Sequence, residues 1–304
     1  MTSAKEKLLS ADPTTVRKII TVGQAKLPYP TFLYKYKHGT EPFLESLVAD
    51  NELFFSSRHQ FNDPMDIAFR FQARATAKER RANVISVIKA NHGRYKDRQK
   101  AFKKVLTPED EIAHYTRAAT MVADKMGIFS FTETARSLLM WAHYAKDHTG
   151  ICLQYYVPAD WRIFQDIAPV RYSSDIVEVL PDTMQRSLFD AFRTKSPHWQ
   201  YEEEWRLLYH EAAGKTRRLK PGALTAVIYG ARCPPAVREN VKKLLHIRAE
   251  RGLPPLKEYE VRLSKRYYHV GIFQEGAAPI ATKKWHGRSD VRESVTGRWR
   301  QEQV

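Results

Sequence analysis

The sequence predicts an α+β domain built on a mixed sheet. Segments typical of strands and helices follow one another irregularly along the 304 residues, without the regular alternation of a doubly wound fold. No G-x-G-x-x-G or G-x-x-x-x-G-K-[ST] turn joins a strand to a helix, which argues against a dinucleotide-binding or P-loop fold. With 43% hydrophobic and 12% aromatic residues, the chain can bury a sizeable core.

The first half of the chain is predicted to hold three strands and a polar helical region. Residues 31–36 (TFLYKY) alternate and are rich in strand-forming types, which is typical of a strand. The last helix of the polar region has a clear start, with Thr107 as N-cap and Pro108 in its first turn, and Gly127 ends it. The elements expected, in order, are a short helix near 14–20, a strand at 31–36, a short helix from Pro42, a strand at 52–57, a turn at 61–66, helices within 76–126 and a strand at 127–131.

The second half is predicted to supply the rest of the sheet. Pro234 and Pro235 open a helix that ends before Gly252. The elements expected, in order, are a helix at 134–146, strands at 150–157 and 169–173, a helix near 182–195, strands at 204–210 and 224–230, the helix from Pro234, and strands at 259–263 and 268–273. We therefore expect a single domain over 31–275.

The remaining segments flank or interrupt this domain. Residues 1–30 are a lead-in punctuated by Gly and Pro. Residues 72–126 are expected to form a basic helical insertion on one side of the sheet. The polar, Gly/Arg-rich tail at 276–304 is expected to be disordered.

The charge balance favours anionic partners. Fifty Lys and Arg residues against 34 Asp and Glu leave a formal net charge of +16, which biases the chain toward nucleic acid, a dinucleotide or an acidic protein. Basic side chains cluster between Arg70 and Lys104, where only Glu79 and Asp97 oppose them. DNA or RNA is the partner expected for this segment, although a solvated helix face would have the same composition.

Cysteine usage and hydropathy indicate the cellular setting. Cys152 and Cys233 are too few for a disulfide framework, and no Cys/His spacing indicates a zinc site, so we expect no metal. No apolar run is long enough to span a membrane, and the N-terminus lacks the features of a secretory signal. A cytoplasmic protein without a membrane partner is therefore predicted.

Several motifs recur in a fixed order along the chain. LYKY is followed by LFFSSRHQFNDPMD, FSF…LLMWAHYAKDHTGICL, VRY and WQYEEEWRL. This string resembles an uncharacterised bacterial family, domain-of-unknown-function family 2971, over about residues 31–275. Its most specific parts are MWAHYA…GIC and W-x-Y-E-x-E-W-R. The resemblance implies no particular activity.

A second, more distant order of motifs resembles the ADP-ribosyltransferase superfamily. LYKYKHG, GIFSF…ARSLLMWAHY and EEEWRLLY follow one another here. The superfamily has a first strand of the type L-Y-H-G, then G-I-Y-F-S…S-x-x-Y, then a strand begun by a catalytic Glu. Its arginine-modifying branch carries E-x-E before that strand, as Glu202 and Glu204 do here. The resemblance implies a split sheet and NAD as the substrate.

Glu202 and Glu204 are the leading catalytic candidates. A strand that starts near Tyr201 places both carboxylates on one face, where they repel unless a cation or substrate intervenes. Breaking an N-glycosidic bond needs a carboxylate beside an oxocarbenium-like sugar. The resemblance implies that Glu204 stabilises this cation and that Glu202 activates the acceptor. The alternative is a structural ion pair with Lys195 or Arg206.

The predicted helix at 134–146 carries four more candidates. The resemblance implies that Tyr144 stacks on nicotinamide, with His143 beside it as a second catalytic candidate. Ser137 and Trp141 are expected to contact the cofactor. The helical spacing of Trp141 and Tyr144 equally fits a core stripe, and His143 equally fits a pair with Asp147 one turn on.

The first strand and its neighbour supply the remaining candidates for binding NAD. Alternation sends Tyr34 and Tyr36 to one face and Lys35 to the other, so a pocket can take the tyrosines or the lysine. These residues replace the usual His or Arg of the superfamily. Motif order adds Ser130, and the spacing from Ser137 to Tyr144 is longer than S-x-x-Y.

The turn at 61–66 contains three further polar residues. Asn62, Asp63 and Asp66 have side chains that could bind a ribose or a metal. The same residues are typical of a turn in which side chains bond their own backbone, and the turn is the favoured interpretation.

These observations predict a NAD-dependent mono-ADP-ribosyltransferase. Its acceptor would be nucleic acid or protein, in bacterial defence or a toxin–antitoxin system in which an antitoxin is a partner. We expect Glu204 and Tyr144 to approach the first strand across one concave pocket. The alternative is a non-catalytic basic module that binds nucleic acid or protein.

Overall fold

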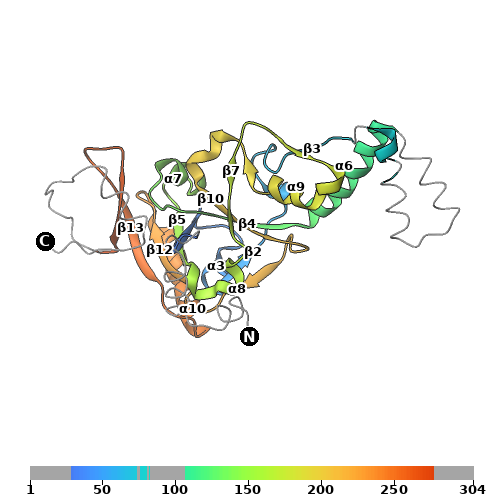
Figure 1. Cartoon of the computed structure of the whole chain (residues 1–304). Coiled ribbons are helices and arrows are strands. Elements are labelled where there is room, and N and C mark those ends of the chain that lie inside the picture. The colour runs from blue at the N-terminus through green and yellow to red at the C-terminus, as the bar shows by residue number, and fades with distance from the viewer. Residues whose placement is uncertain (1–28, 74–75, 81, 83–106, 277–304) are drawn as a thin grey trace, which may run out of the picture.

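The structure is a computed structural model, and it describes residues 29–73, 76–80, 82 and 107–276 (Figure 1). Most of the lead-in, of the tail and of the basic segment between Arg70 and Lys104 lies outside these residues. The predictions made for those parts of the chain, including the short helix near 14–20, therefore stay predictions.

One mixed sheet of eight strands organises the fold, in the order β14-β13-β12-β5-β1-β4-β10-β6. Within it β12 and β13 run parallel, and the other neighbours are antiparallel. The predicted α+β class with a mixed, mostly antiparallel sheet is confirmed. The strands are β1 (Phe32–Lys37), β4 (Gly127–Thr132), β5 (Ile151–Tyr156), β6 (Ala168–Pro169), β10 (Glu204–Tyr209), β12 (Leu224–Tyr229), β13 (Lys257–Leu263) and β14 (Val270–Gln274).

Short strand pairs and helices surround the sheet. The pairs are β2 (Glu52–Phe54) with β11 (Thr216–Arg218), β3 (Phe69–Phe71) with β8 (Val177–Val179), and β7 (Arg171–Tyr172) with β9 (Thr194–Lys195). The α-helices are α3 (Leu44–Val48), α6 (Pro108–Lys125), α7 (Leu138–Tyr144), α8 (Trp161–Phe164), α9 (Met184–Ala191) and α10 (Pro235–Glu250). The 3₁₀ helices are η1 (Arg58–Gln60), η2 (Val157–Asp160), η3 (Pro181–Thr183) and η4 (Pro197–Glu202).

The large sheet divides between β1 and β4. β1 pairs with β5 at six positions but with β4 only at Tyr34 and Thr132. Farther along the same edge of β4, Ile128 forms a bridge with Ser56 through two backbone hydrogen bonds of 2.9 Å. Ser130 lies between these positions and has no pairing partner on this edge among the described residues. A five-stranded part and a three-stranded part therefore meet at one residue pair.

The main core lies on the face that carries Leu33, Phe129 and Leu207, against α3, α8 and α10 (Figure 1). Phe129 and Leu207 lie opposite each other in the register of β4 and β10, and all three residues belong to the same core cluster. On α10, Val237 and Val241 are four residues apart and meet the sheet from the same side of the helix. Burial of these two surfaces fixes the helices to the sheet.

The opposite face is covered by α7, η4 and the ends of α6 and α9. Tyr34 and Tyr36 pack there against Trp141 of α7, and Ile128 and Leu208 pack against residues of the α6 and α9 region. The cover is less apolar than that of the main core, because polar strand residues also point to this side. The candidate catalytic residues lie on this face.

Local chemistry accounts for the start of two helices. Thr107 accepts a hydrogen bond from the Asp110 amide (3.1 Å), with Pro108 at the first position of α6, as predicted. The helix expected at 134–146 begins later, at Leu138, because Ser137 caps it by accepting a bond from the Met140 amide (3.3 Å). The preceding residues instead form hydrogen-bonded turns.

Candidate functional site

A row of polar side chains crosses the junction of the two parts of the sheet. The register places Gln154 beside Tyr34, Tyr34 beside Thr132, and Thr132 beside Glu204. Gln154 donates to the Tyr34 hydroxyl (3.2 Å) and accepts from the Thr225 hydroxyl (3.0 Å). Glu204 on β10 is therefore tied to the first strand through the one position where β1 and β4 pair.

Five buried charged side chains meet at the Glu204 end of this row, and we call them the charge cluster. They are Asp66, Lys195, Glu202, Glu204 and Arg206, each with a side chain at most 5% exposed. The Lys195 ammonium lies 2.6 Å from Glu202, 3.3 Å from Glu204 and 3.5 Å from Asp66. Three carboxylates against two cations leave one net negative charge when all are ionised.

Arg206 fixes one end of the charge cluster. Its guanidinium donates to both carboxylate oxygens of Glu204, at 2.7 and 3.0 Å, and to Asp66 at 2.7 Å. A third direction is used by the Phe192 carbonyl, at 2.9 Å. The planar guanidinium of an arginine can donate in all these directions at once, and the ammonium of a lysine could not replace it in this geometry. Oδ1 of Asp66 is buried and has no hydrogen-bond partner among the described residues.

Glu204 is held in its ionised form. Burial acts to raise the pKa of its carboxyl, but the charges of Arg206 and Lys195 outweigh burial and lower that pKa to about 2. Hydrogen bonds from Arg206 and from the Ser130 hydroxyl act in the same direction. The Glu204 amide also donates to the Tyr172 hydroxyl (3.0 Å), which fixes the start of β10. Glu204 therefore acts as a fixed negative charge.

Glu202 has the opposite electrostatic character. Burial raises the pKa of its carboxyl above the ordinary value, the Lys195 charge opposes this shift, and the nearby Glu204 charge adds to it. The Tyr144 hydroxyl donates a short hydrogen bond to the other oxygen of Glu202. Burial and the Glu202 charge in turn raise the pKa of Tyr144. Glu202 is thus the carboxylate of the pair that holds a proton more readily.

Aromatic side chains form the edge of the charge cluster toward solvent. Tyr144 is half-buried, and the exposed His143 bonds the Tyr201 hydroxyl through Nδ1 at 2.8 Å. The Trp199 ring lies 4.8 Å from the Lys195 ammonium, and its indole N–H donates to Asp63 at 2.7 Å. No bond joins His143 to Asp147 within the described residues, because α7 ends at Tyr144 and Asp147 does not lie one helical turn on.

Two of the expected cofactor contacts are used within the fold instead. Trp141 is 0% exposed, packs edge-to-face on Tyr36 at 5.0 Å, and donates its indole N–H to the Ala135 carbonyl (2.8 Å). Its ring is enclosed in the fold, which fits the core alternative for its spacing. The Ser137 hydroxyl caps α7, which explains its position before the helix without a ligand.

The other candidates divide between the two faces of the sheet as alternation requires. Tyr34 and Ser130 lie on the face of the charge cluster, where Ser130 bonds Glu204. The Lys35 side chain points to the other face, with its ammonium 4.9 Å from the centre of the Phe129 ring. Burial, followed by the charge of Lys37, lowers the pKa of Lys35 to about 7. The site therefore includes the tyrosine rather than the lysine.

The strand predicted at 204–210 is confirmed, but it does not extend back to Tyr201 as the argument for a shared face required. β10 begins at Glu204, Glu202 ends η4, and Glu203 between them has a left-handed backbone with φ of 44°. Strand alternation therefore does not explain why the two carboxylates converge. They converge because the turn at Glu203 directs both toward Lys195, which matches the ion-pair alternative for this motif.

The turn at 61–66 serves two purposes. Asp63 accepts from the Met65 amide (2.8 Å), as expected for a side chain that bonds its own turn. The Asp66 amide also closes this turn by donating to the Asp63 carbonyl (3.1 Å), but its side chain joins the charge cluster instead of bonding its own backbone. Gln154 and Tyr172 also belong to the site and were not predicted. An alternating strand with a polar residue at a buried position, as at Gln154, was the available signal.

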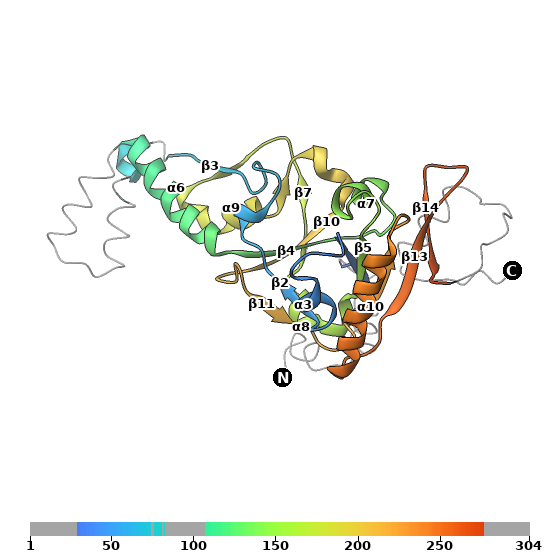
Figure 2. The ribbon, with the colours of Figure 1, turned by 180° about the vertical axis from the view of Figure 1, so that it is seen from behind.

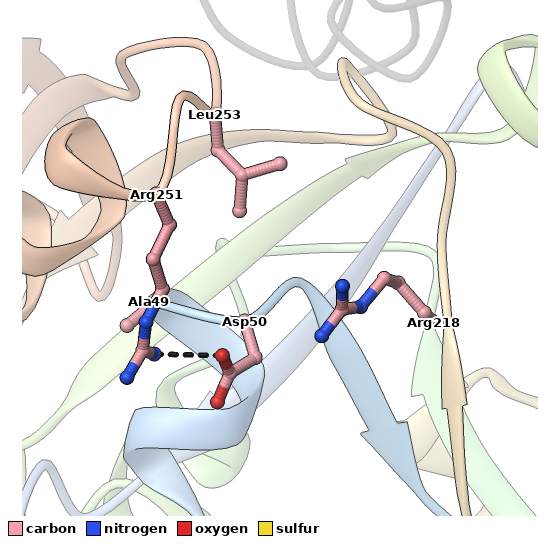
Figure 3. A pocket seen from close by; sticks show the side chains of 5 residues that line it. All are labelled: Ala49, Asp50, Arg218, Arg251 and Leu253. Carbon is pink, nitrogen blue, oxygen red and sulfur yellow. Dashed lines mark hydrogen bonds and ion pairs between the residues drawn. The ribbon is translucent and has the colours of Figure 1, made fainter.

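Glu204 does not line an open pocket, contrary to expectation, since it is 5% exposed and held by Arg206. A surface pocket of about 380 Å³ lies elsewhere (Figure 3), and its lining residues are Ala49, Asp50, Arg218, Arg251 and Leu253. Arg251 bonds Asp50 at 2.7 Å across this pocket, and Arg218 is paired with Glu52 at 3.0 Å. No predicted site residue lines it.

Comparison with known proteins identifies one family. Residues 140–207 match the family described as protein of unknown function, DUF2971. This supports the resemblance to that family, and the matched segment carries four of the five residues of the charge cluster, together with Tyr144. No curated protein and no solved structure matches the chain, so the resemblance to ADP-ribosyltransferases has no support from relatives.

Two features were not found in the described part of the chain. Among the described residues, no group of three or more His, Cys, Asp or Glu is placed to hold a metal ion. Within the same part of the chain, no helix combines the length and the apolar character needed to cross a bilayer.

Proposed function

We propose that the chain breaks the N-glycosidic bond of NAD and transfers the ADP-ribosyl group to an acceptor. The observation that carries this proposal is a pair of adjacent carboxylates whose pKa values are displaced in opposite directions, Glu204 downward and Glu202 upward. Such pairs divide into a permanently ionised group and a proton-exchanging group in enzymes that act on glycosidic bonds. Motif order adds the expectation that the sugar belongs to NAD.

The two glutamates would have separate tasks in this reaction. The bond between ribose C1 and the nicotinamide nitrogen breaks, and nicotinamide leaves with the bonding electrons. The negative charge of Glu204 favours the cationic ribosyl group that develops. An acceptor oxygen or nitrogen then bonds to C1, and its proton passes to Glu202. Lys195 holds the two carboxylates together throughout.

The position of the carboxylates at the junction of the sheet supports this assignment. On this edge of β4, Thr132 pairs with Tyr34 and Ile128 pairs with Ser56. The backbone N–H and C=O of Ser130, between them, point to the same edge, where no strand of the described residues pairs with Ser130. An amide group, such as the carboxamide of nicotinamide, has both a donor and an acceptor and can therefore hydrogen-bond to an unpaired strand edge of this kind. Glu204 and Ser130 are in contact at the same place.

Access to Glu202 requires a movement of Tyr144. Glu202 is 3% exposed, whereas Tyr144, bonded to it, is half-buried and reaches the surface beside His143. A substrate that displaces the Tyr144 hydroxyl would take over its hydrogen bond to Glu202. The ring would then be free to stack on nicotinamide, the role that motif order implies for it.

A second candidate function is a non-catalytic nucleic-acid-binding module in the cytoplasm. The net charge of +16 favours it, together with the basic segment between Arg70 and Lys104. In this case the charge cluster would be structural only. The chain could then serve bacterial defence by binding nucleic acid or an antitoxin without turning over NAD.

Measuring nicotinamide release from NAD by three single variants distinguishes the transferase from the non-catalytic binding module. Glu202→Gln and Glu204→Gln remove one negative charge each from the charge cluster, and Glu203→Gln removes the same charge from the exposed residue between them. We expect release to fall on the order of 10²-fold or more for Glu202→Gln and Glu204→Gln. Glu203→Gln should behave as the wild type, because its side chain is exposed and outside the charge cluster.

The thermal midpoint of each variant is measured beside its activity. Lost release by Glu202→Gln with an unchanged midpoint supports catalysis by this carboxylate. Equal release by Glu202→Gln and the wild type would contradict its role. If the wild type releases no nicotinamide with nucleic-acid and protein acceptors present, the binding module is the better account.

A further inference from the structure

The hairpin formed by β13 and β14 lies at the end of the sheet, and Arg238 of α10 ties it to the rest of the fold through Glu260 and Glu275 (Figure 2). β14 pairs only with β13 in the described sheet, up to Leu263 and Val270. Its tip is an ordered turn, because the Ser264 hydroxyl accepts from the amides of Arg266 and Tyr267, both at 3.1 Å. The Ser264 amide also donates to the His269 carbonyl at 3.0 Å.

Large side chains at this tip are unusually exposed. Tyr268 is 101% exposed, Tyr267 is 51% exposed and Leu263 is 46% exposed. The main clusters of buried residues include neither tyrosine. Tyr268 is held fully in solvent by a well-bonded turn, and exposed aromatic rings of this kind are typical of binding surfaces.

The charge of the tip is positive. Between Val261 and Val270 the sequence has three basic residues and no Asp or Glu. Arg262 is paired with Glu260 at 2.7 Å, whereas Lys265 and Arg266 have no carboxylate partner among the described residues. The Arg266 guanidinium lies over one face of the Tyr267 ring, 5.4 Å from its centre, so a cation and an aromatic ring are held together at the tip.

We propose that this tip binds single-stranded nucleic acid, with Tyr268 and Tyr267 stacked on bases and Lys265 and Arg266 at phosphates. Exposed aromatic rings interleaved with cations are the usual means of holding an unpaired strand without sequence preference. A duplex hides the faces of its bases, so only the basic side chains of the tip would contact it. The proposal is independent of NAD chemistry, because the tip contains no residue of the charge cluster, and it is tested by binding rather than turnover.

The test is fluorescence anisotropy of the full chain with labelled DNA and RNA strands of one sequence, about 12 nucleotides long. Tyr268→Ala removes the fully exposed ring and Tyr268→Phe keeps it, and neither should move the thermal midpoint. We expect Tyr268→Ala to weaken single-strand binding on the order of 10-fold, and Tyr268→Phe by less than about 2-fold. Lys265→Gln should reduce the log–log salt slope by about 0.7.

A matched control removes charge elsewhere on the surface. Lys242→Gln and Lys243→Gln change exposed lysines of α10, and single-strand binding should stay within about 2-fold of the wild type. Equal binding of DNA and RNA supports stacking alone, and tighter binding of RNA supports added contacts with the 2′-hydroxyl.

Three results would overturn the proposal. The first is unchanged single-strand binding by Tyr268→Ala, and the second is equal affinity of the wild type for a duplex. The third is no binding by the wild type, and in that case a protein would be the remaining candidate partner of this surface.

Discussion

Replacing Glu204 by Gln should destabilise the protein by about 3 kcal/mol near neutral pH. The variant keeps the size of the side chain but leaves the fully buried Arg206 with Asp66 as its one carboxylate partner in the charge cluster. A fall of the Glu204 pKa from 4.5 to about 2 corresponds to about 3 kcal/mol at 1.36 kcal/mol per pKa unit. Removing one partner of a buried ion pair costs about 3–5 kcal/mol in general, so the two values agree.

The pH dependence of this effect has a definite sign. The folded-state pKa of Glu204 lies below the unfolded value, so its contribution is present above about pH 4.5 and disappears as the pH falls through about 2. The raised pKa of Glu202 has the opposite consequence, since its ionised form costs stability at higher pH. Glu202→Gln should therefore lower the unfolding free energy by less than Glu204→Gln does. The loss of unfolding free energy caused by Glu202→Gln should shrink as the pH rises.

The assay is denaturant unfolding of both variants and of Glu203→Gln, followed by circular dichroism between about pH 3 and pH 8. A loss of about 3 kcal/mol lowers the thermal midpoint by roughly 6–12 °C for a domain of this size. Glu203→Gln should change the unfolding free energy by less than about 0.5 kcal/mol. A loss below about 1 kcal/mol for Glu204→Gln would refute the argument, since the buried ion pairs would then contribute little to folding.

Two further variants test the remaining assignments. Trp141→Phe should destabilise the protein by about 2 kcal/mol, because the buried Ala135 carbonyl loses its donor, while nicotinamide release per folded molecule stays unchanged. If Trp141→Phe changes the KM for NAD without changing stability, Trp141 contacts the ligand after all. Lys35→Met should stabilise the protein below about pH 7, where folded Lys35 must carry its charge, and the gain should shrink as the pH rises from about 7 toward 10.5. Urea unfolding at about pH 6 and pH 10 checks this, and an equal gain at both values would contradict the lowered pKa.

The fold class and the starts of the long helices followed from the sequence by itself. Alternation in TFLYKY and the short apolar run LTAVIY locate β1 and β12, because a half-buried strand repeats every two residues and a short apolar run is typical of a buried strand. Thr107 with Pro108, and Pro235, mark the starts of α6 and α10, because capping depends on residues within one turn of the chain. The motif order also located Glu202, Glu204 and Tyr144, which the structure brings together.

The tertiary structure alone decided which charges these residues meet. Asp66 reaches Arg206 across 140 positions of sequence, and Gln154 reaches Tyr34 across 120, separations at which local pattern carries no information. The opposite pKa shifts of Glu202 and Glu204 depend on how deeply each is buried and on its distance from Lys195 and Arg206. These quantities arise only when η4, β9 and β10 pack against the turn at 61–66, because electrostatic interactions depend on separation in space rather than on order along the chain.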